Sequence, residues 1–239
     1  MNQKDLVKLT QKKYRREMGL CIVEGDKLVA EHKHHAVGIF HEPKLSYLEN
    51  GSGVLAVVPI PTATRVTFPY LVLDNVQDPG NVGTLIRTAR AFGFDTIFSI
   101  NSADVWSQKV IRAAAGTQFG MQIYECNFAE FKILYDTHLA HSKLLVADAP
   151  EKTPVANATP PLKKGAVSSL DPAPFLKGGD PQGSGVFGLV LGNEGQGVGP
   201  EMRALPHEIV SIPMASGVES LNVAVAGGII MARFSGCMK

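Results

Sequence analysis

The chain is 239 residues long, enough for one large domain or for one domain with a small appendage. Hydrophobic residues make up 45% of it and charged residues 19%, the balance of a globular protein with ample material for a core. The formal net charge is only +1, so overall charge does not indicate a nucleic-acid partner, and any such binding must come from a local patch.

Cysteine use and hydropathy exclude further classes. The 3 cysteines, Cys21, Cys126 and Cys237, are far apart and odd in number, which fits neither a disulfide framework nor a zinc site. No apolar run reaches the roughly 18 residues needed to span a bilayer. The first residues lack the apolar core of a secretory signal. These features predict a soluble, cytoplasmic protein.

Residues 1–62 are expected to form a small α/β domain. A charged helix, with six Lys or Arg among the first 17 residues, precedes a strand at 20–25, a helix at 27–33 and a strand at 36–40. The basic residues are the clearest local positive charge, although a solvated helix face would have the same composition. The run VPIPTATRVTFP holds three prolines and has no helical period, so the boundary to a second domain, 63–239, is placed there.

From Tyr70 onward, strand and helix patterns alternate, which is typical of a parallel, doubly wound α/β sheet. Strands are predicted at 70–74, 95–100, 121–125, 143–147, 186–191 and 207–212. Helices are predicted near 80–92, 107–115, 128–140, 199–205 and 219–234. The stretch 149–185 interrupts the alternation with Pro, Gly and Lys, and is expected to be a long surface insertion.

The last predicted helix is apolar around its whole circumference and rich in Gly and Ala. Such a helix must be buried on every side. Its small residues permit close backbone approach, which suits either a tightly packed core or a subunit interface.

Three segments join a short apolar strand to a helix through a turn rich in Gly, Asn, Glu or Ser. They are DNVQDPGNVGTLIRTARAFG at 74–93, LVLGNEGQGVGPEM at 189–202 and SIPMASGVESLNVAVAGGIIMARF at 211–234. In open α/β sheets, ligands bind outside the carboxyl ends of the strands, where such turns gather. The three turns therefore predict one composite site.

Some local patterns have other interpretations. The glycines of the second segment suggest a dinucleotide-binding loop, but Pro200 stands where the third glycine of that fingerprint belongs. Four histidines, at positions 32, 34, 35 and 41, could form a metal-binding tract, but no Cys or carboxylate lies at ligand spacing, and no metal is expected. Ser216 with Glu219 fits a capping box for the last helix. Taken alone, Arg87 would be an ordinary surface arginine.

Together the three segments resemble the signature motifs of the SpoU (TrmH-type) family of RNA ribose 2′-O-methyltransferases. The first segment has the pattern N-x-G-x-x-x-R from Asn81 to Arg87, the second has G-N-E-G-x-G at 192–197, and the third has I-P-M followed by S-L-N at 220–222. The stretch KVIRAAAG is similar to the family's K-V-x-R-A-S-x-G, with Ala114 where serine is usual. The N-terminal KKYRREMGLCIVEG is similar to the opening of a small ribosomal-protein-like RNA-binding domain, here in shortened form.

This resemblance implies a parallel-sheet α/β domain with a deep C-terminal trefoil knot, an exception to the rule that chains are unknotted, plus a small N-terminal α/β RNA-binding domain. It implies a homodimer formed through the knotted domain, with S-adenosylmethionine as cofactor. The implied cofactor-binding residues are Leu191, Gly192, Asn193, Gly197, Ile212, Pro213, Met214 and Leu221. The implied catalytic residues are Asn81, Arg87, Glu194, Ser220 and Asn222. The expected RNA-binding residues are Lys12, Lys13, Arg15, Arg16 and Arg112.

The implied reaction is methyl transfer from S-adenosylmethionine to a ribose 2′-hydroxyl in structured RNA. Ribosomal RNA is preferred over transfer RNA because the N-terminal segment resembles that of ribosome-directed members. In the family Arg87 is often drawn as a base, but arginine stays protonated in proteins, so an electrostatic role is the alternative. The other candidate functions are a transfer-RNA 2′-O-methyltransferase, a non-catalytic RNA-binding assembly protein of the same fold, and a nicotinamide-dependent enzyme.

Overall fold

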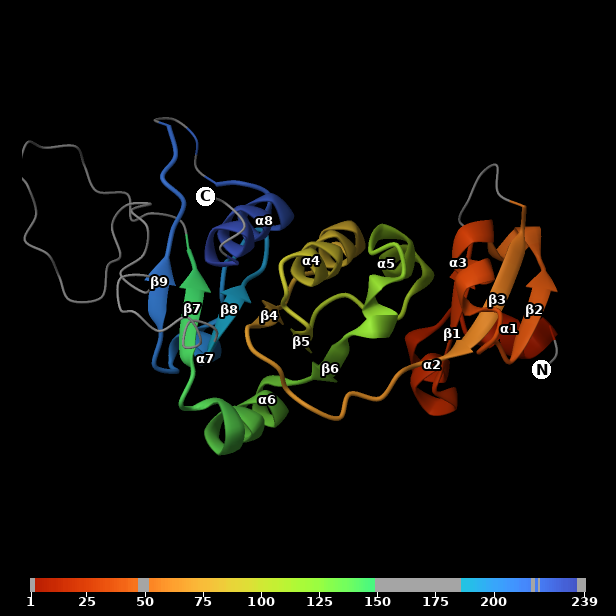
Figure 1. The fold of residues 1–239 in the computed structure, drawn as a ribbon, viewed down its shortest axis with the longest axis horizontal. Helices are drawn as coiled ribbons and strands as arrows, with labels where there is room; N and C mark the ends of the chain where they lie inside the picture. Colours follow the sequence, from red (N-terminus) through yellow and green to blue (C-terminus); the bar gives the residue numbers. More distant parts are fainter. Residues whose placement is uncertain (1–2, 47–51, 149–185, 216–217, 219, 236–239) are drawn as a thin grey trace, which may run out of the picture.

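The structure is a computed structural model that describes residues 3–46, 52–148, 186–215, 218 and 220–235. The expected insertion at 149–185 and the capping residues Ser216 and Glu219 lie outside these residues. The described strands form two sheets, which lie at opposite ends of an elongated molecule in Figure 1.

The smaller sheet is antiparallel and is built from residues before 60. It has the order β1-β3-β2, and its strands are β1 (Leu20–Glu24), β2 (Gly38–His41) and β3 (Val54–Pro59). Around it lie α1 (Gln3–Lys8), α2 (Lys12–Met18), α3 (Asp26–His32) and the 3-10 turn η1 (Pro43–Leu45). The expected single basic helix is therefore two helices. The central strand β3 was not predicted. It can end at Pro59 because β2 pairs only with residues 54–57, so Pro59 has a neighbouring strand on one side alone, as in an edge strand.

The larger sheet is parallel throughout and has the order β6-β5-β4-β8-β7-β9. Its strands are β4 (Tyr70–Asp74), β5 (Thr96–Ile100), β6 (Gln122–Cys126), β7 (Lys143–Ala147), β8 (Phe187–Leu191) and β9 (Glu208–Val210). Every residue of the central strands β4 and β8 is buried, as expected for a parallel sheet covered on both faces. All six strands match the sequence prediction.

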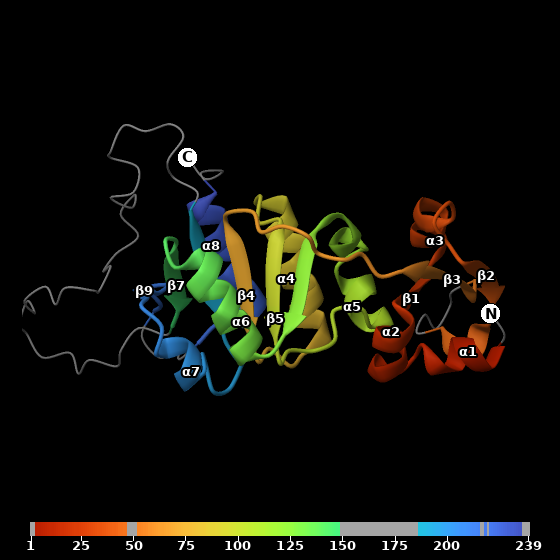
Figure 2. The same ribbon diagram turned by 90° about the horizontal axis from the view of Figure 1, so that it is seen from below.

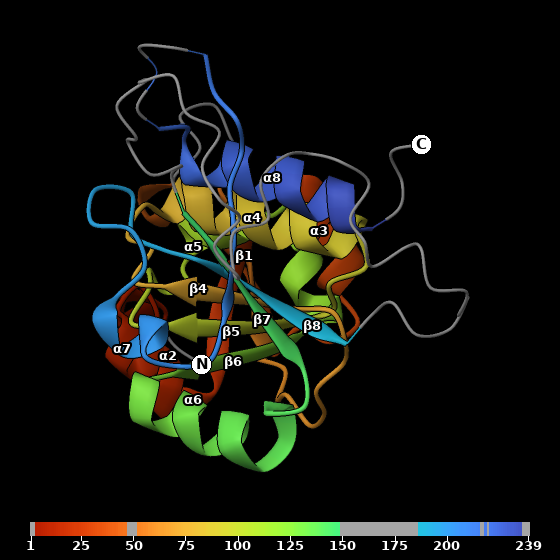
Figure 3. The ribbon, with the colours of Figure 1, turned by 90° about the vertical axis from the view of Figure 1, so that its left-hand side faces the viewer.

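Helices cover both faces of the larger sheet. The elements that follow β4 are α4 (Pro79–Ala91), α5 (Gln108–Ala113), η2 (Thr117–Gly120), α6 (Phe128–Leu134), the π-helical turn η3 (Tyr135–Leu139), α7 (Pro200–Arg203) and α8 (Val223–Phe234). Figure 3 shows α4 and α8 side by side on one face and α6 on the other; Figure 2 shows the same layers from below. Apolar residues at helical spacing give α4 its buried side: Val82, Leu85, Ile86 and Ala89 are all buried, and Phe92, just past the end of the helix, is half-buried.

The last helix differs from its prediction in two ways. It begins at Val223 rather than near 219, because the Asn222 side chain accepts hydrogen bonds from the backbone N–H groups of Ala224 and Val225 and so caps the helix. It is also not covered on every side within one chain. Ile230 and Met231 are buried, whereas Val225 is 52% exposed.

Candidate functional site

The strand order places a topological switch point between β4 and β8. From β4 the chain moves outward through β5 to β6, whereas β8, β7 and β9 lie on the other side of β4. Loops that leave neighbouring strands in opposite directions open a crevice at the carboxyl ends of those strands. The β4 loop leads to α4 and the β8 loop leads to α7, so the first two predicted motifs meet there.

A chain of three side chains links all three motifs. Asn81, in the first turn of α4, donates a hydrogen bond of 3.1 Å from Nδ2 to Oε1 of Glu194. Asn222, the N-cap of α8, donates from its own Nδ2 to Oδ1 of Asn81 at 2.9 Å. The structure thus brings together three of the five predicted catalytic residues. The orientation of the Asn81 amide is fixed, because its oxygen accepts and its nitrogen donates.

Glu194 is held as a carboxylate by this arrangement. Its oxygens also accept hydrogen bonds from the backbone N–H groups of Gln77 at 3.4 Å and Asp78 at 3.3 Å. Burial acts to raise the pKa of Glu194, but the hydrogen bonds from Asn81 and from the backbone outweigh it, and the pKa is lowered. The site therefore presents a fixed negative charge that accepts hydrogen bonds at neutral pH.

The turn from Gly192 to Gly199 has a shape that depends on its glycines. Asn193 and Gly197 exchange backbone hydrogen bonds of 2.9 Å, and Gly197 has a φ of 72°. A Cβ on Gly192 would lie closer than 3.0 Å to backbone atoms of Gly197 and Val198, so a larger residue cannot occupy that position without moving the turn. The Asn193 side chain accepts from the N–H of Gly195 and donates to the Asn75 carbonyl at 3.0 Å, which ties the turn to the β4 loop.

Asp74 fixes the other end of this turn, a role that the sequence reasoning missed. The carboxylate stands at the last position of β4 and accepts a hydrogen bond of 2.7 Å from the Gly199 N–H, at the start of α7. Burial raises the pKa of Asp74, while the Gly199 hydrogen bond acts in the opposite direction. The only signal in the sequence was an acidic residue ending an otherwise apolar strand.

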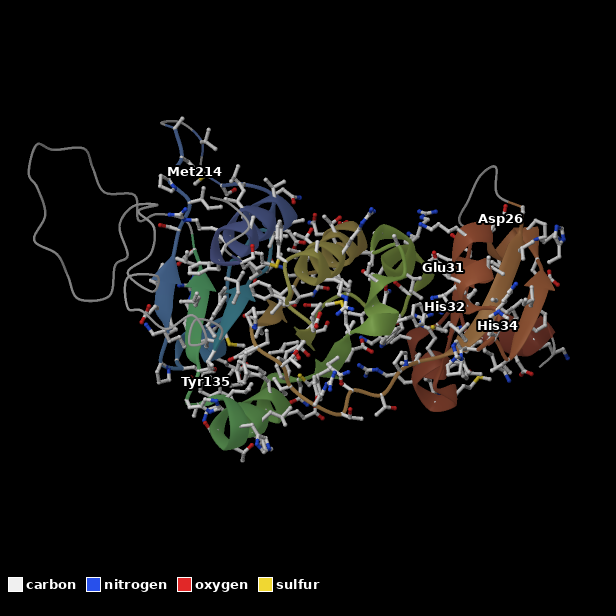
Figure 4. All side chains as sticks on the ribbon, viewed as in Figure 1. Asp26, Glu31, His32, His34, Tyr135 and Met214 are labelled. Carbon is white, nitrogen blue, oxygen red and sulfur yellow. The ribbon has the colours of Figure 1, made fainter. Side chains whose placement is uncertain are left out.

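A cavity of about 440 Å³ lies beside this Glu194–Asn81–Asn222 chain. Its described lining includes nine of the predicted site residues: Leu191, Gly192, Asn193, Glu194, Gly197, Ile212, Met214, Ser220 and Leu221. Residues of α8 and the loop after β9 form an apolar wall, and the glycine turn forms a polar one. Met214 lies in that loop, on the side of the sheet where α8 lies (Figure 4). Asp148 and Arg203 also line the cavity and were not predicted.

Four of the predicted catalytic and cofactor-binding residues lie apart from this lining. Pro213 is not among the residues that line the cavity. Asn81 and Asn222 reach it only through Glu194 and the start of α8. Arg87 is exposed on α4, and within the described ranges it forms no hydrogen bond or ion pair with the Glu194–Asn81–Asn222 chain or with other residues.

The expected basic RNA-binding surface at the N-terminus is used in part for packing. The prediction for Arg15 is wrong, because its side chain is only 5% exposed and forms an ion pair with Asp104, before α5. Its Nε donates to Asp104 at 3.1 Å and its Nη1 donates to the Leu9 carbonyl at 2.6 Å. The guanidinium is therefore not available to a phosphate.

The other predicted basic residues retain exposure. Lys12 and Arg16 lie 3.2 Å and 3.7 Å from the Glu125 carboxylate of β6, and Lys13 lies on the exposed side of α2. Burial and the neighbouring Asp104 raise the pKa of Glu125, against the effect of Lys12 and Arg16. These contacts attach α2 to the larger sheet.

Arg112 of α5 is exposed, and it approaches the buried Glu24 carboxylate of β1 at 3.6 Å. It thus lies where the smaller sheet contacts α5, and it stays a candidate RNA contact.

The histidines do not form a metal centre in the part of the chain that the structure describes, where no three metal-ligating side chains cluster. The ring of His32, at the end of α3, packs against Phe119 with centroids 4.3 Å apart. Burial lowers the pKa of His32. Figure 4 shows His32 and His34 at the end of the molecule opposite α8. In the described residues no helix is long and apolar enough to cross a membrane.

A parallel α/β domain with a cavity at the carboxyl ends of its central strands is the class of fold that binds ligands at this edge of the sheet. The particular family follows from comparison with known proteins: residues 69–232 match the SpoU rRNA Methylase family, and the chain belongs to it.

Named relatives agree with this membership. The chain is 32% identical over 167 residues to the 23S rRNA (guanosine(2553)-2′-O)-methyltransferase RlmP of Bacillus subtilis, covering 70% of this chain and 57% of that protein. It is 29% identical over 217 residues to the mitochondrial rRNA methyltransferase 3A of Danio rerio, covering 78% of this chain and 50% of that protein. The chain thus spans about half the length of such curated relatives.

Solved structures match over nearly the whole chain. A putative RNA methyltransferase of the TrmH family from Porphyromonas gingivalis is 27% identical, with a TM-score of 0.71 over 97% of this chain and 95% of that one. An AdoMet-bound rRNA methyltransferase from Sinorhizobium meliloti shares the fold at 24% identity, with a TM-score of 0.73 over 99% and 94% of the two chains.

Proposed function

We propose that this protein transfers a methyl group from S-adenosylmethionine to a ribose 2′-hydroxyl of structured RNA. The observation that carries the proposal is the hydrogen-bonded chain Glu194–Asn81–Asn222, which links three family motifs at the rim of a cavity of about 440 Å³. Family membership supports an RNA methyltransferase, and the RlmP relative is named as a 2′-O-methyltransferase.

The cavity fits the cofactor. Gly192, Gly195 and Gly197 line the cavity and can offer only main-chain groups to a ligand, and Ile212 and Leu221 supply apolar surface for an adenine ring. When bound there, S-adenosylmethionine supplies an activated methyl group on a sulfonium cation. The residues proposed to hold it are Leu191, Gly192, Asn193, Gly197, Ile212, Pro213, Met214 and Leu221.

Catalysis by this chain consists mainly of alignment. Holding the reacting atoms in line can supply about 7–11 kcal/mol of the barrier. Glu194 accepts hydrogen bonds from Asn81 and the backbone, so it can orient a ribose hydroxyl without itself moving. Ser220 lines the same cavity, and its proposed role is to contact the ribose. Arg87 remains cationic, so its proposed role is to lower the pKa of the 2′-hydroxyl and to gather an adjacent RNA phosphate.

RNA binding is proposed for Lys12, Lys13, Arg16 and Arg112, with residues 1–62 as the substrate-binding domain. Arg15 is removed from this set because it is buried. One hydrophobic cluster includes Cys21 and Ala56 of the smaller sheet together with Leu85 of α4, so deleting the domain would expose core residues of the other. Point substitutions at exposed basic residues therefore test RNA binding better than truncation does.

The assembly is proposed to be a homodimer through α8. Val225 of α8 is 52% exposed in the single chain, and Leu221, which lies just before the helix and lines the cavity, is 37% exposed. A second copy would remove this apolar surface from water and would bury the side of the apolar helix that a single chain leaves exposed. We extend the proposal to a trefoil knot in the C-terminal part, on the family resemblance.

Ribosomal RNA is the proposed substrate, with transfer RNA as the alternative, because both relatives above are named as rRNA methyltransferases. A non-catalytic assembly protein would not need Asn81, Glu194 and Asn222 in one hydrogen-bonded chain. The test incubates the protein with bulk RNA and methyl-labelled S-adenosylmethionine, then digests the RNA to nucleosides. Label in 2′-O-methylnucleosides supports the proposal, whereas label in bases or no transfer contradicts it. Mapping ribose methylation in cells with and without the gene would identify the nucleotide.

A further inference from the structure

An ion pair of two residues that the family motifs do not include stands in the cavity wall. Asp148 follows β7 and Arg203 ends α7, and Nη1 of Arg203 lies 2.8 Å from Oδ2 of Asp148. Both residues line the cavity, and their side chains are 34% and 31% exposed for Arg203 and Asp148 respectively. The pair is thus accessible from the cavity rather than sealed in the core.

The guanidinium of Arg203 is held in a defined orientation. Its Nε donates a hydrogen bond of 3.0 Å to the Val198 carbonyl, and its Nη1 contacts Asp148. The remaining amino group, Nη2, lies at the glycine turn, 3.7 Å from the position that a Cβ would take at Gly197. The glycine at that position therefore leaves room beside Nη2, on the polar side of the cavity.

The charges of the cavity lining restrict what Arg203 can bind. Among the described lining residues the charged side chains are Asp148, Glu194 and Arg203. Glu194 already accepts hydrogen bonds from Asn81 and from the backbone of the β4 loop. Arg203 is the one cationic side chain among these described lining residues. S-adenosylmethionine carries two positive groups, the sulfonium and the α-ammonium, and one negative group, the α-carboxylate. A planar guanidinium is the side chain best suited to a carboxylate.

We propose that Arg203 binds the α-carboxylate of S-adenosylmethionine through Nη2. Asp148 acts as a positioning residue that keeps the guanidinium at the cavity wall. This inference rests on the proposed cofactor. It assigns to Arg203 the recognition of the ligand's carboxylate, which a decarboxylated analogue lacks.

The test measures binding by isothermal titration with two ligands that differ only in the carboxylate, S-adenosylmethionine and its decarboxylated analogue. Because a hydrogen bond to a charged group is worth about 1.5–3 kcal/mol, the wild type should bind the intact ligand about 10–100-fold more tightly. In Arg203→Gln the ratio of the two affinities should fall to near 1, because only the affinity for the intact ligand decreases. Asp148→Asn should reduce the ratio partially.

Lys143→Gln is the matched control, since it removes a cation of β7 that is also ion-paired, with Glu208, but lies outside this cavity lining. It should leave both affinities unchanged. Thermal unfolding of each variant checks its fold, and Arg203→Lys provides a second variant that keeps the charge but loses the planar fork. A purely structural role for Arg203 would weaken both ligands equally, and that result would overturn the proposal, as would a wild type that does not discriminate between them. If the wild type bound neither ligand, the cofactor assignment itself would fail.

Discussion

Asn81 donates a hydrogen bond to Glu194 across 113 positions of sequence, at 3.1 Å. Replacing Asn81 with Asp removes this donor and sets a second carboxylate against Glu194. Like charges disfavour ionisation, so the pKa of Glu194 should rise in Asn81→Asp. Methyl transfer should fall about 10–100-fold, the equivalent of one hydrogen bond to a charged group. The assay is the rate of label transfer to RNA under single-turnover conditions.

A matched control for this substitution exists on the opposite face of the sheet. Asn127 caps α6, accepting from the Glu130 N–H at 2.9 Å, and aspartate is an equally good cap. Asn127→Asp should therefore keep full activity. Equal losses in the two variants would show that the Asn81–Glu194 bond has no special role.

The glycine turn makes a prediction about cofactor affinity. Gly192→Ala places a Cβ closer than 3.0 Å to backbone atoms of Gly197 and Val198, so the turn must shift. We expect S-adenosylmethionine affinity to fall at least about 10-fold, since the cavity wall moves with the turn. At Gly195 the nearest atom to an added Cβ is Oδ1 of Asn193 at 3.7 Å, so Gly195→Ala should bind normally. Titration calorimetry distinguishes the two variants. Normal binding by Gly192→Ala would contradict this view of the turn.

The buried ion pair between Arg15 and Asp104 should stabilise the contact between the two sheets. Removing one partner leaves an uncompensated charge, which typically costs about 3–5 kcal/mol. Arg15→Met and Asp104→Asn should each lower the free energy of unfolding by an amount of that order. The double variant should lose less than the sum of the two. Lys13 is exposed, so Lys13→Met should change the free energy of unfolding by less than about 0.5 kcal/mol. Additive losses in urea denaturation would argue against a coupled pair.

Asp74 gives the protein a specific pH dependence. Its folded-state pKa is raised above the ordinary value of 3.8, so folding favours the protonated acid. Its contribution to stability is present below the unfolded pKa and is lost as pH rises through the folded pKa. Asp74→Asn keeps an acceptor for the Gly199 N–H and removes the charge. The melting temperature of Asp74→Asn relative to wild type should therefore increase as pH rises from 3 to 7, in steps of about one unit. A difference that shrinks over this range would contradict the assignment.

The larger sheet was predictable because its strands are short apolar runs separated by amphipathic helices, and each run had no other place to bury its side chains. Strand β3 was not, because Pro59 and the prolines that follow resemble a linker when read locally. The burial of Arg15 depends on Asp104, which lies 89 positions away in the sequence. No local pattern indicates such a distant partner, so this burial could not be predicted.

The candidate site, too, was predictable from the sequence only in part. Spacing placed the motif turns at the carboxyl ends of strands, but the roles of Asn81, Glu194 and Asn222 came from family resemblance. The supporting residues Asp74, Asp148 and Arg203 were missed because ordinary acidic and basic residues at strand and helix ends carry no signature. Their roles become visible only in the folded contacts of Asp74 with Gly199 and of Asp148 with Arg203.

The most direct test of the central claim compares wild type with Arg87→Ala in two measurements, the rate of 2′-O-methylnucleoside formation and the affinity for S-adenosylmethionine. Arg87 is exposed on α4 and is not among the residues that line the cavity, so its loss should leave cofactor affinity near wild type. The rate should fall at least about 100-fold, the scale on which a residue that stabilises developing charge contributes. A variant that keeps most of its turnover would contradict the account.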